Sequence, residues 1–104
     1  MELLVVDNTA AHRFELRADD ELAASIHYRE DDPKVYSLLH TETVPKFAGQ
    51  GMASALVFQI FERLRADGGQ VLPYCPFVNS YIRKHPDTAS LVPSDERNRF
   101  GVAV

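Results

Sequence analysis

The sequence contains little cysteine and no long apolar run. Its single thiol, Cys75, excludes both an internal disulfide framework and a zinc site built from several cysteines. No apolar run approaches the roughly 20 residues that a membrane-spanning helix needs, and the charged, mixed segment after Met1 is unlike a signal peptide. His12 and His27 show no metal-ligand spacing with carboxylates. We therefore expect a cytoplasmic protein without a metal site.

Length and composition are those of one ordinary globular domain. The 104 residues suffice for a modest core, and 45% of them are hydrophobic against 25% charged. A formal net charge of −4 argues against a dominant nucleic-acid-binding face. No repeat or linker-like segment divides the chain. We expect a single domain over residues 1–93 and a poorly ordered C-terminal tail over residues 94–104.

The first 44 residues are typical of antiparallel β-structure. A short apolar run is followed by three segments in which apolar and polar residues alternate or β-branched and aromatic residues gather, with turn signals between them. The predicted strands are 3–6, 13–17, 22–29 and 34–43, and the turns are 18–21 and 30–33.

The second half of the chain predicts helices alternating with short strands. A long amphipathic helix is indicated by apolar residues at spacings of three and four, and Gly68-Gly69 ends it. After it we expect a strand over 70–72, a helix over 77–84 and a last short strand over 87–92. The fold class is therefore α+β, or mixed α/β: antiparallel strands followed by strand-helix-strand-helix. The strands on either side of the long helix should form a crossover pair in one sheet.

The segment 44–56 is the most informative part of the chain, because a strand passes through a glycine turn directly into a helix. Gly49 and Gly51 allow the backbone to approach an anion closely, and the first N–H groups of a helix have no helical partner. Ala53 is small, and Lys46 adds a positive charge beside the turn. The pattern is neither a nucleotide-hydrolase phosphate loop nor a dinucleotide fingerprint. Glycines at this place are also often plain turn residues.

Four segments, in order, resemble the GCN5-related N-acetyltransferase superfamily, and more closely its small single-domain, Yjdj-like branch. The resemblance covers about residues 10–93 and implies a compact acyl-CoA N-acyltransferase-like fold, with coenzyme A in the gap between two splayed strands. Acetyl-CoA is the implied donor and an amine the implied acceptor. A departure is Ala48, where the superfamily usually carries Gln or Arg. The matching segments are 40–45, 49–51, 73–78 and 81–86.

The same resemblance implies that the pyrophosphate of coenzyme A lies on the backbone of the glycine turn. The Arg83-Lys84-His85 cluster could contact the cofactor's 3′-phosphate, or could be a solvated helix end. The residues expected to bind the cofactor are Val44, Lys46, Gly49, Gln50, Gly51, Met52, Ala53 and Ser54, together with Cys75, Asn79 and Lys84.

Four side chains are candidates for the chemistry. Glu42 and His40 lie two apart on a strand, so they share a face from which either could deprotonate an amine, with Glu42 preferred. Tyr81 resembles by position the tyrosine that protonates the leaving thiolate in the superfamily. Cys75 could accept the acyl group transiently. Each has an alternative interpretation. Glu42 and His40 could be polar residues on a solvated strand, Tyr81 an aromatic residue in the core, and Cys75 a buried small apolar residue.

Three functions fit the sequence. The favoured one is an acetyl-CoA-dependent N-acetyltransferase acting on an unidentified amine. The second is a module that binds coenzyme A or carries an acyl group without efficient turnover, and the third is an interaction domain that retains only the fold. We expect no nucleic acid or membrane partner, and either a monomer or a homodimer.

Overall fold

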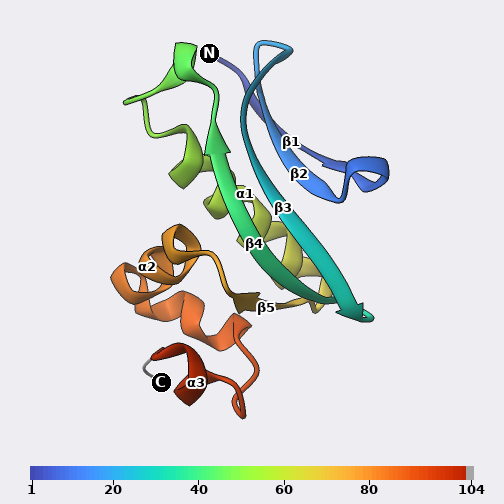
Figure 1. The fold of residues 1–104 in the computed structure, drawn as a ribbon, viewed down its shortest axis with the longest axis vertical. Coiled ribbons are helices and arrows are strands. Elements are labelled where there is room, and N and C mark those ends of the chain that lie inside the picture. Colours follow the sequence, from blue (N-terminus) through green and yellow to red (C-terminus); the bar gives the residue numbers. More distant parts are fainter. Residues whose placement is uncertain (103–104) are drawn as a thin grey trace.

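The computed structural model describes residues 1–102 and contains one five-stranded sheet with a long helix across one face (Figure 1). Three short 3₁₀ helices, Thr9–Ala11, Pro45–Phe47 and Pro86–Leu91, connect the larger elements. The strands are β1 (Leu3–Asn8), β2 (Arg13–Ala18), β3 (Glu21–Asp32), β4 (Val35–Thr43) and β5 (Gln70–Pro73), and the helices are α1 (Met52–Asp67), α2 (Pro76–Lys84) and α3 (Arg97–Phe100).

The strands lie in the sheet in the order of the sequence, β1-β2-β3-β4-β5. The first four form an antiparallel meander, whereas β4 and β5 are parallel and are connected through α1. The predicted mixed α/β fold and the pairing of the strands on either side of the long helix are confirmed.

Helix α1 buries its apolar stripe against the sheet. Leu56, Val57 and Ile60 are fully buried, and they lie in one core with strand residues Leu16 and Ile26. Burying a side chain of this size contributes about 1.5–3 kcal/mol, so this layer accounts for much of the stability of the domain. Figure 1 shows α1 passing behind β3 and β4.

A bulge in β4 changes which side chains face α1. Tyr28 of β3 lies opposite Leu38, but the preceding residue His27 lies opposite His40, so Leu39 is an extra residue in β4. After the bulge, Thr41 lies on the face covered by α1, whereas His40 lies on the opposite face. The bulge falls next to the last paired residue of β4 and β5, where the two strands separate.

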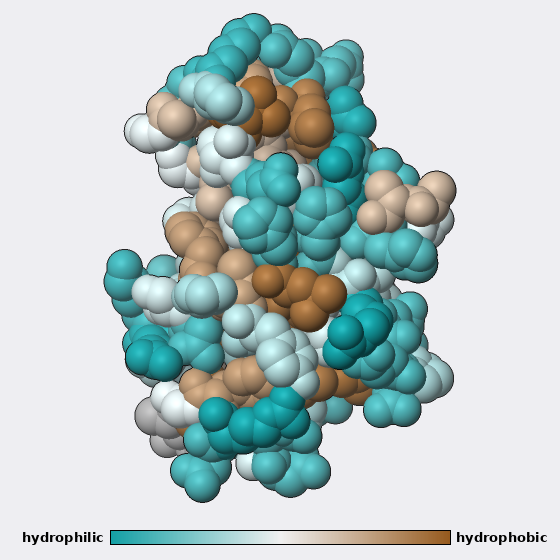
Figure 2. Space-filling view, viewed as in Figure 1, coloured by the Kyte–Doolittle hydropathy of each residue, from teal (hydrophilic) through white to brown (hydrophobic). Residues whose placement is uncertain are grey.

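The sheet face opposite α1 is mainly polar and carries one buried acid. Glu15 is 1% exposed, and its carboxylate accepts hydrogen bonds from Asn8, Arg13 and Arg17 at 2.7–3.0 Å. These contacts, with the Asn8 amide first, lower the pKa of Glu15 to about 2. Figure 2 shows this face as largely hydrophilic, with separate hydrophobic patches. In the described part of the chain, no helix has both the length and the hydropathy to cross a bilayer.

The expectation of a last strand over 87–92 was wrong, because residues Pro86–Leu91 form a 3₁₀ helix. Pro86 supplies a fixed φ at the first helical position, and the hydroxyls of Thr88 and Ser90 donate to carbonyls three residues earlier, at 2.7 and 3.3 Å. These local hydrogen bonds favour a tight turn over an extended strand.

The C-terminal segment also differs from the expected poorly ordered tail. Residues 97–100 form α3, and Val102 is buried against the core. The amide of Asn79 donates to the carbonyl of Phe100 at 2.9 Å, and Arg97 Nε donates to the carbonyl of Val92 at 2.9 Å. Residues 94–102 therefore belong to the packed domain, while 103 and 104 lie outside the described residues.

Candidate functional site

The centre of the candidate site is a gap between β4 and β5. The two strands pair only from Val35 and Gln70 to Leu38 and Pro73, although β4 continues to Thr43. Past Pro73 the chain turns away into α2, and the amide of Cys75 donates to the carbonyl of Leu38 at 2.8 Å. The edge of β4 beyond Leu38 thus faces the gap without a strand beside it in the described structure.

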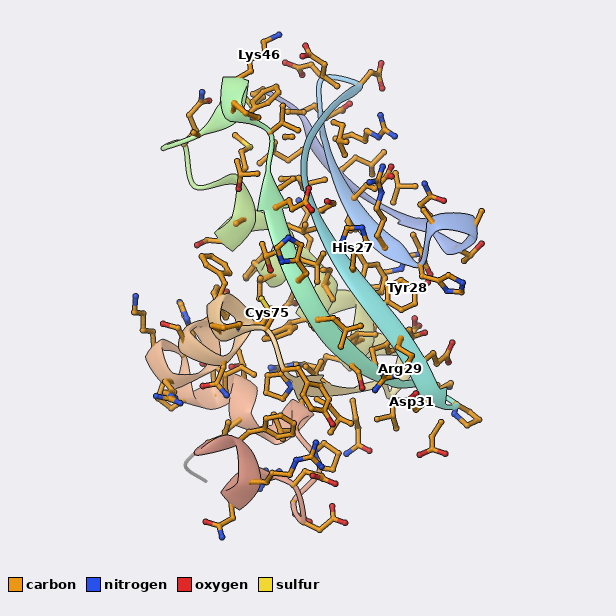
Figure 3. The ribbon with its side chains drawn as sticks, in the orientation of Figure 1. His27, Tyr28, Arg29, Asp31, Lys46 and Cys75 are labelled. Atoms are coloured by element: carbon orange, nitrogen blue, oxygen red, sulfur yellow. The ribbon has the colours of Figure 1, made fainter. Side chains whose placement is uncertain are left out.

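Cys75 and Thr41 meet across this gap. The thiol sulfur lies 3.1 Å from the Thr41 hydroxyl, and Cys75 is 3% exposed. Figure 3 shows Cys75 beside β4. Cys75 is the N-cap residue of α2, in extended conformation with Pro76 at the first helical position. The thiol therefore lies at the start of α2, beside a hydroxyl of β4.

The glycine turn lies at the start of α1. Gly49 and Gly51 have φ values of +78° and +74°, a left-handed conformation that favours glycine. A Cβ atom built at either position would meet no heavy atom within 4 Å, so the space over the turn is open. Within residues 1–102 no side chain caps α1, and its first turn carries no acid, which leaves the amides after Gly51 available to an anion.

A small groove connects the first turn of α1 with α2. Its volume is about 80 Å³, and it is lined by Ser54, Phe77, Ser80, Tyr81, Lys84 and His85. Lys84 forms no ion pair within residues 1–102. Its ammonium is therefore a cation beside the turn that the rest of the described chain does not neutralise.

Tyr81 lies in this groove and not beside the thiol. Its ring stacks on His85 with centroids 4.0 Å apart and meets Phe61 edge-on at 5.7 Å. Burial first, and then the negative charges of Asp87 and Glu62, raise the pKa of Tyr81, so its hydroxyl stays protonated at neutral pH. It is six residues beyond Cys75, about 9 Å along a helix axis.

His40 and Glu42 lie on the sheet face opposite the thiol. His40 Nε2 is 3.1 Å from Glu42 Oε1, and both side chains are more than half exposed. The ring of His40 also stacks on that of His27, with centroids 6.1 Å apart and planes at 13°. The structure therefore joins the two candidate bases into one pair, but separates that pair from Cys75 by the thickness of β4.

Two expected cofactor residues are already engaged elsewhere. The ammonium of Lys46 pairs with Glu21 at 2.8 Å and lies at the far end of the sheet (Figure 3). The Asn79 amide is bound to Phe100 on the side of α2 that faces α3. Of the others, Gly49, Gln50 and Ser54 are exposed at the turn, Val44 and Ala53 are partly buried, and Met52 is buried in the core.

Comparison with known proteins settles the family. The family model described as GCN5-related N-acetyl-transferase matches residues 13–91. The chain belongs to this family. A search of curated proteins finds no match. The resemblance to the superfamily is confirmed, and its Yjdj-like branch stays a prediction.

One solved structure supports this fold, and a second is less similar. A protein from Staphylococcus aureus, provisionally described as a GCN5-like N-acetyltransferase, superposes with a TM-score of 0.63 at 19% identity, over 88% of this chain and 87% of that one. Ard1 from Thermoplasma volcanium superposes with a TM-score of 0.47 at 15% identity, over 58% of this chain and 41% of its own. The first likeness shows that the GCN5-related fold is present over most of the described domain.

Within this GCN5-related domain, the structure adds residues that sequence reasoning missed. Thr41 contacts the thiol, whereas the sequence pattern pointed only to its neighbours His40 and Glu42. Phe77 and Ser80 line the groove beside Tyr81. The spacing of 77, 81 and 84 on one helix stripe is a signal that could have found Phe77. The bulge that turns Thr41 toward Cys75 leaves no comparable signal in the sequence.

Proposed function

We propose that this chain is an N-acetyltransferase that transfers an acetyl group from acetyl-CoA to an amine. The observation that carries the proposal is the early end of the β4–β5 pairing at Leu38 and Pro73, which opens a gap between two strands. An extended thioester can enter this gap and hydrogen-bond to the free edge of β4. The glycine turn and the α1–α2 groove supply the binding surface for the rest of coenzyme A.

Backbone amides and a lysine ammonium would together bind the phosphates of coenzyme A. The amides from Gly51 to Ser54 would hold the pyrophosphate, because they have no helical partner and the first turn of α1 carries no acid. Lys84, which lines the adjoining groove, would supply the positive charge beside the turn. The sequence had assigned this role to Lys46, which is paired with Glu21. Gly49 keeps the space over the turn open.

The chemistry requires two protons to leave the nitrogen of the acceptor and one proton to reach the departing thiolate. Glu42, paired with His40, takes the proton of the ammonium so that the neutral amine can attack the thioester carbon. The new C–N bond forms as the C–S bond breaks. The nitrogen then loses its second proton to solvent, and the thiolate of coenzyme A needs one proton. Tyr81, protonated at neutral pH, is the candidate donor to a thiolate that leaves on the side of the α1–α2 groove.

A second candidate function is an acyl-carrying module, favoured by the contact between Thr41 and Cys75. The Thr41 hydroxyl would assist transfer of the acetyl group to the Cys75 thiol. The two candidate general bases, His40 and Glu42, lie on the other face of β4. A stable acetyl-thioenzyme that no amine discharges would favour this module. An interaction domain without coenzyme A is the third alternative, and it predicts no binding at all.

The proposal also includes the acceptor, the compartment and the oligomeric state expected from the sequence. The acceptor would be a small or protein-borne amine met in the cytoplasm, by a monomer or a homodimer. The net charge of −4 gives a weak preference for basic acceptors. Nucleic acid and membranes are not required by any step.

The deciding experiment is calorimetric titration of coenzyme A and acetyl-CoA into the protein and into Gly51→Glu. Gly68→Glu is a matched control, since Gly68 has the same φ of +74° and open surroundings at the other end of α1. Binding that Gly51→Glu abolishes and Gly68→Glu retains would support the proposed site. No heat from the folded wild-type protein would overturn both the transferase and the module.

A further inference from the structure

A second cavity lies on the other side of α2 from the groove that contains Lys84. Its volume is about 440 Å³. Figure 1 places α3 near α2, at the end of the molecule opposite the loop before α1. Helix α2 contributes residues spaced three and four apart, which form a different stripe from that of Tyr81 and Lys84. The lining residues are Pro73, Tyr74, Pro76, Asn79, Ser80, Arg83, Arg99 and Phe100.

The charged residues of this cavity are both arginines, although the chain as a whole is acidic. Arg99 Nη1 pairs with Glu96 at 3.0 Å, whereas Arg83 forms no ion pair with any residue from 1 to 102. A guanidinium offers a planar set of N–H donors that matches a carboxylate or a phosphate. Arg83 is therefore a cation at the cavity whose natural counterion the described chain does not provide.

The walls of the cavity are aromatic and held in place. Tyr74 and Phe100 meet edge to face with centroids 5.0 Å apart. The Arg99 guanidinium lies 5.1 Å from the ring centre of Tyr74 and 4.8 Å from that of Phe100, and it also donates to the Tyr74 hydroxyl. The Asn79 amide joins α2 to the carbonyl of Phe100. These contacts hold Arg99 and the two aromatic rings in place before any ligand arrives, which reduces the entropy lost on binding.

We propose that this cavity, the Arg83–Arg99 pocket, binds a small organic anion whose carboxylate or phosphate contacts Arg83 and whose flat body lies against Tyr74 and Phe100. The volume falls within the range of about 300–1,000 Å³ that is usual for small-molecule sites. The pocket adjoins the proposed coenzyme A groove, and Ser80 is the lining residue that the two have in common. Its wall includes the residues on both sides of Cys75, so a bound ligand contacts the turn that positions the thiol.

The test uses three matched probes: benzoate, phenyl phosphate and the neutral benzyl alcohol. Each is titrated into the full chain while backbone amide signals are followed by NMR, in the wild type and in Arg83→Gln and Arg99→Gln. Arg63→Gln is the control, because Arg63 is an exposed arginine on α1 that lines none of these sites. A carboxylate site responds to benzoate and a phosphate site to phenyl phosphate, and the pocket must respond to at least one.

We expect saturable shifts at Tyr74, Asn79 and Phe100 with an anionic probe and none with benzyl alcohol. Loss of one charge-assisted hydrogen bond should weaken binding about tenfold or more in Arg83→Gln, with Arg63→Gln unchanged. Shifts that are absent with both anions, or equal in Arg83→Gln and the wild type, would overturn the proposal. So would coenzyme A shifts at the same amides that Arg83→Gln removes, because the pocket would then be part of the coenzyme A site.

Discussion

The hydroxyl of Thr41 and the thiol of Cys75 lie 3.1 Å apart across the gap where β4 and β5 separate. The bulge at Leu39 makes this contact, because it turns Thr41 toward the covered face of the sheet. The two side chains come from segments 34 residues apart in the chain. Their contact places a nucleophilic atom next to a hydrogen-bond donor inside the proposed acyl site.

Replacing Thr41 by valine should slow the chemistry of Cys75. The Thr41 hydroxyl is the donor available to a thiolate at this position, and a charge-assisted hydrogen bond of this kind is worth about tenfold or more in rate. The measurement is the alkylation rate of the thiol by iodoacetamide at fixed pH, followed by intact mass. Thr43→Val, on the same strand face, is the control. Equal rates in Thr41→Val and wild type would remove Thr41 from the site.

Replacing Glu42 by glutamine should lower turnover without weakening the binding of acetyl-CoA. Removing a general base costs about a hundredfold in rate. Binding should be unaffected, because Glu42 lies on the sheet face opposite the one covered by α1. Release of free coenzyme A thiol, with the best acceptor from an amine screen, measures turnover. Glu2→Gln is the control at an exposed carboxylate. Full activity in Glu42→Gln would place the base elsewhere.

Lys84 should contribute more to coenzyme A affinity than Lys46. Lys46 is paired with Glu21, whereas Lys84 lines the groove next to Ser54. One partly exposed charge contact is worth up to about 1 kcal/mol, so Lys84→Gln should weaken binding about fivefold and Lys46→Gln hardly at all. Calorimetry on both variants checks the comparison. The reverse order would mean that Lys46 leaves Glu21 to meet the phosphates.

Glu15 should stabilise the fold above pH 4.5 and progressively less below it. Its pKa falls from 4.5 to about 2 on folding, so its contribution is fully present above the unfolded value and is lost as the pH drops toward about 2. We expect Glu15→Gln to cost on the order of 2 kcal/mol at pH 7, and nearly nothing at pH 2. Urea unfolding at several pH values measures this.

The control for Glu15 is Asp95→Asn, at an exposed carboxylate. It should leave the free energy of unfolding nearly unchanged at every pH. A cost for Glu15→Gln that does not depend on pH would show that the side chain acts through packing and not through its charge.

The strand and helix pattern of this chain could be read largely from the sequence. The period-two alternation around Phe14 and the three- and four-residue spacing from Met52 to Leu64 reflect burial of one face, and burial is local to each element. The last segments could not be read in this way. The tight turn over Pro86–Leu91 depends on hydroxyl contacts, and α3 depends on packing against α2.

The candidate site was only partly predictable, because its parts have different origins. The glycine turn can be recognised from the sequence, because Gly49 and Gly51 adopt a left-handed backbone conformation that favours glycine. In the sequence, Lys46 is the cation beside the turn, and Lys84 is either a cofactor contact or part of a solvated helix end. Only the fold shows that one meets Glu21 and the other lines the groove.

The sequence by itself determined the strands and the first two helices, the glycine turn and the membership of the GCN5-related family, because these follow from local preference and from motifs read along the chain. Tertiary structure alone decided that Thr41 meets Cys75, that His40 and Glu42 lie on the opposite face, and that two arginines share a pocket. A single bulge residue reverses the facing of every side chain after it. Contacts between distant segments depend on that register, which periodicity in one segment does not record.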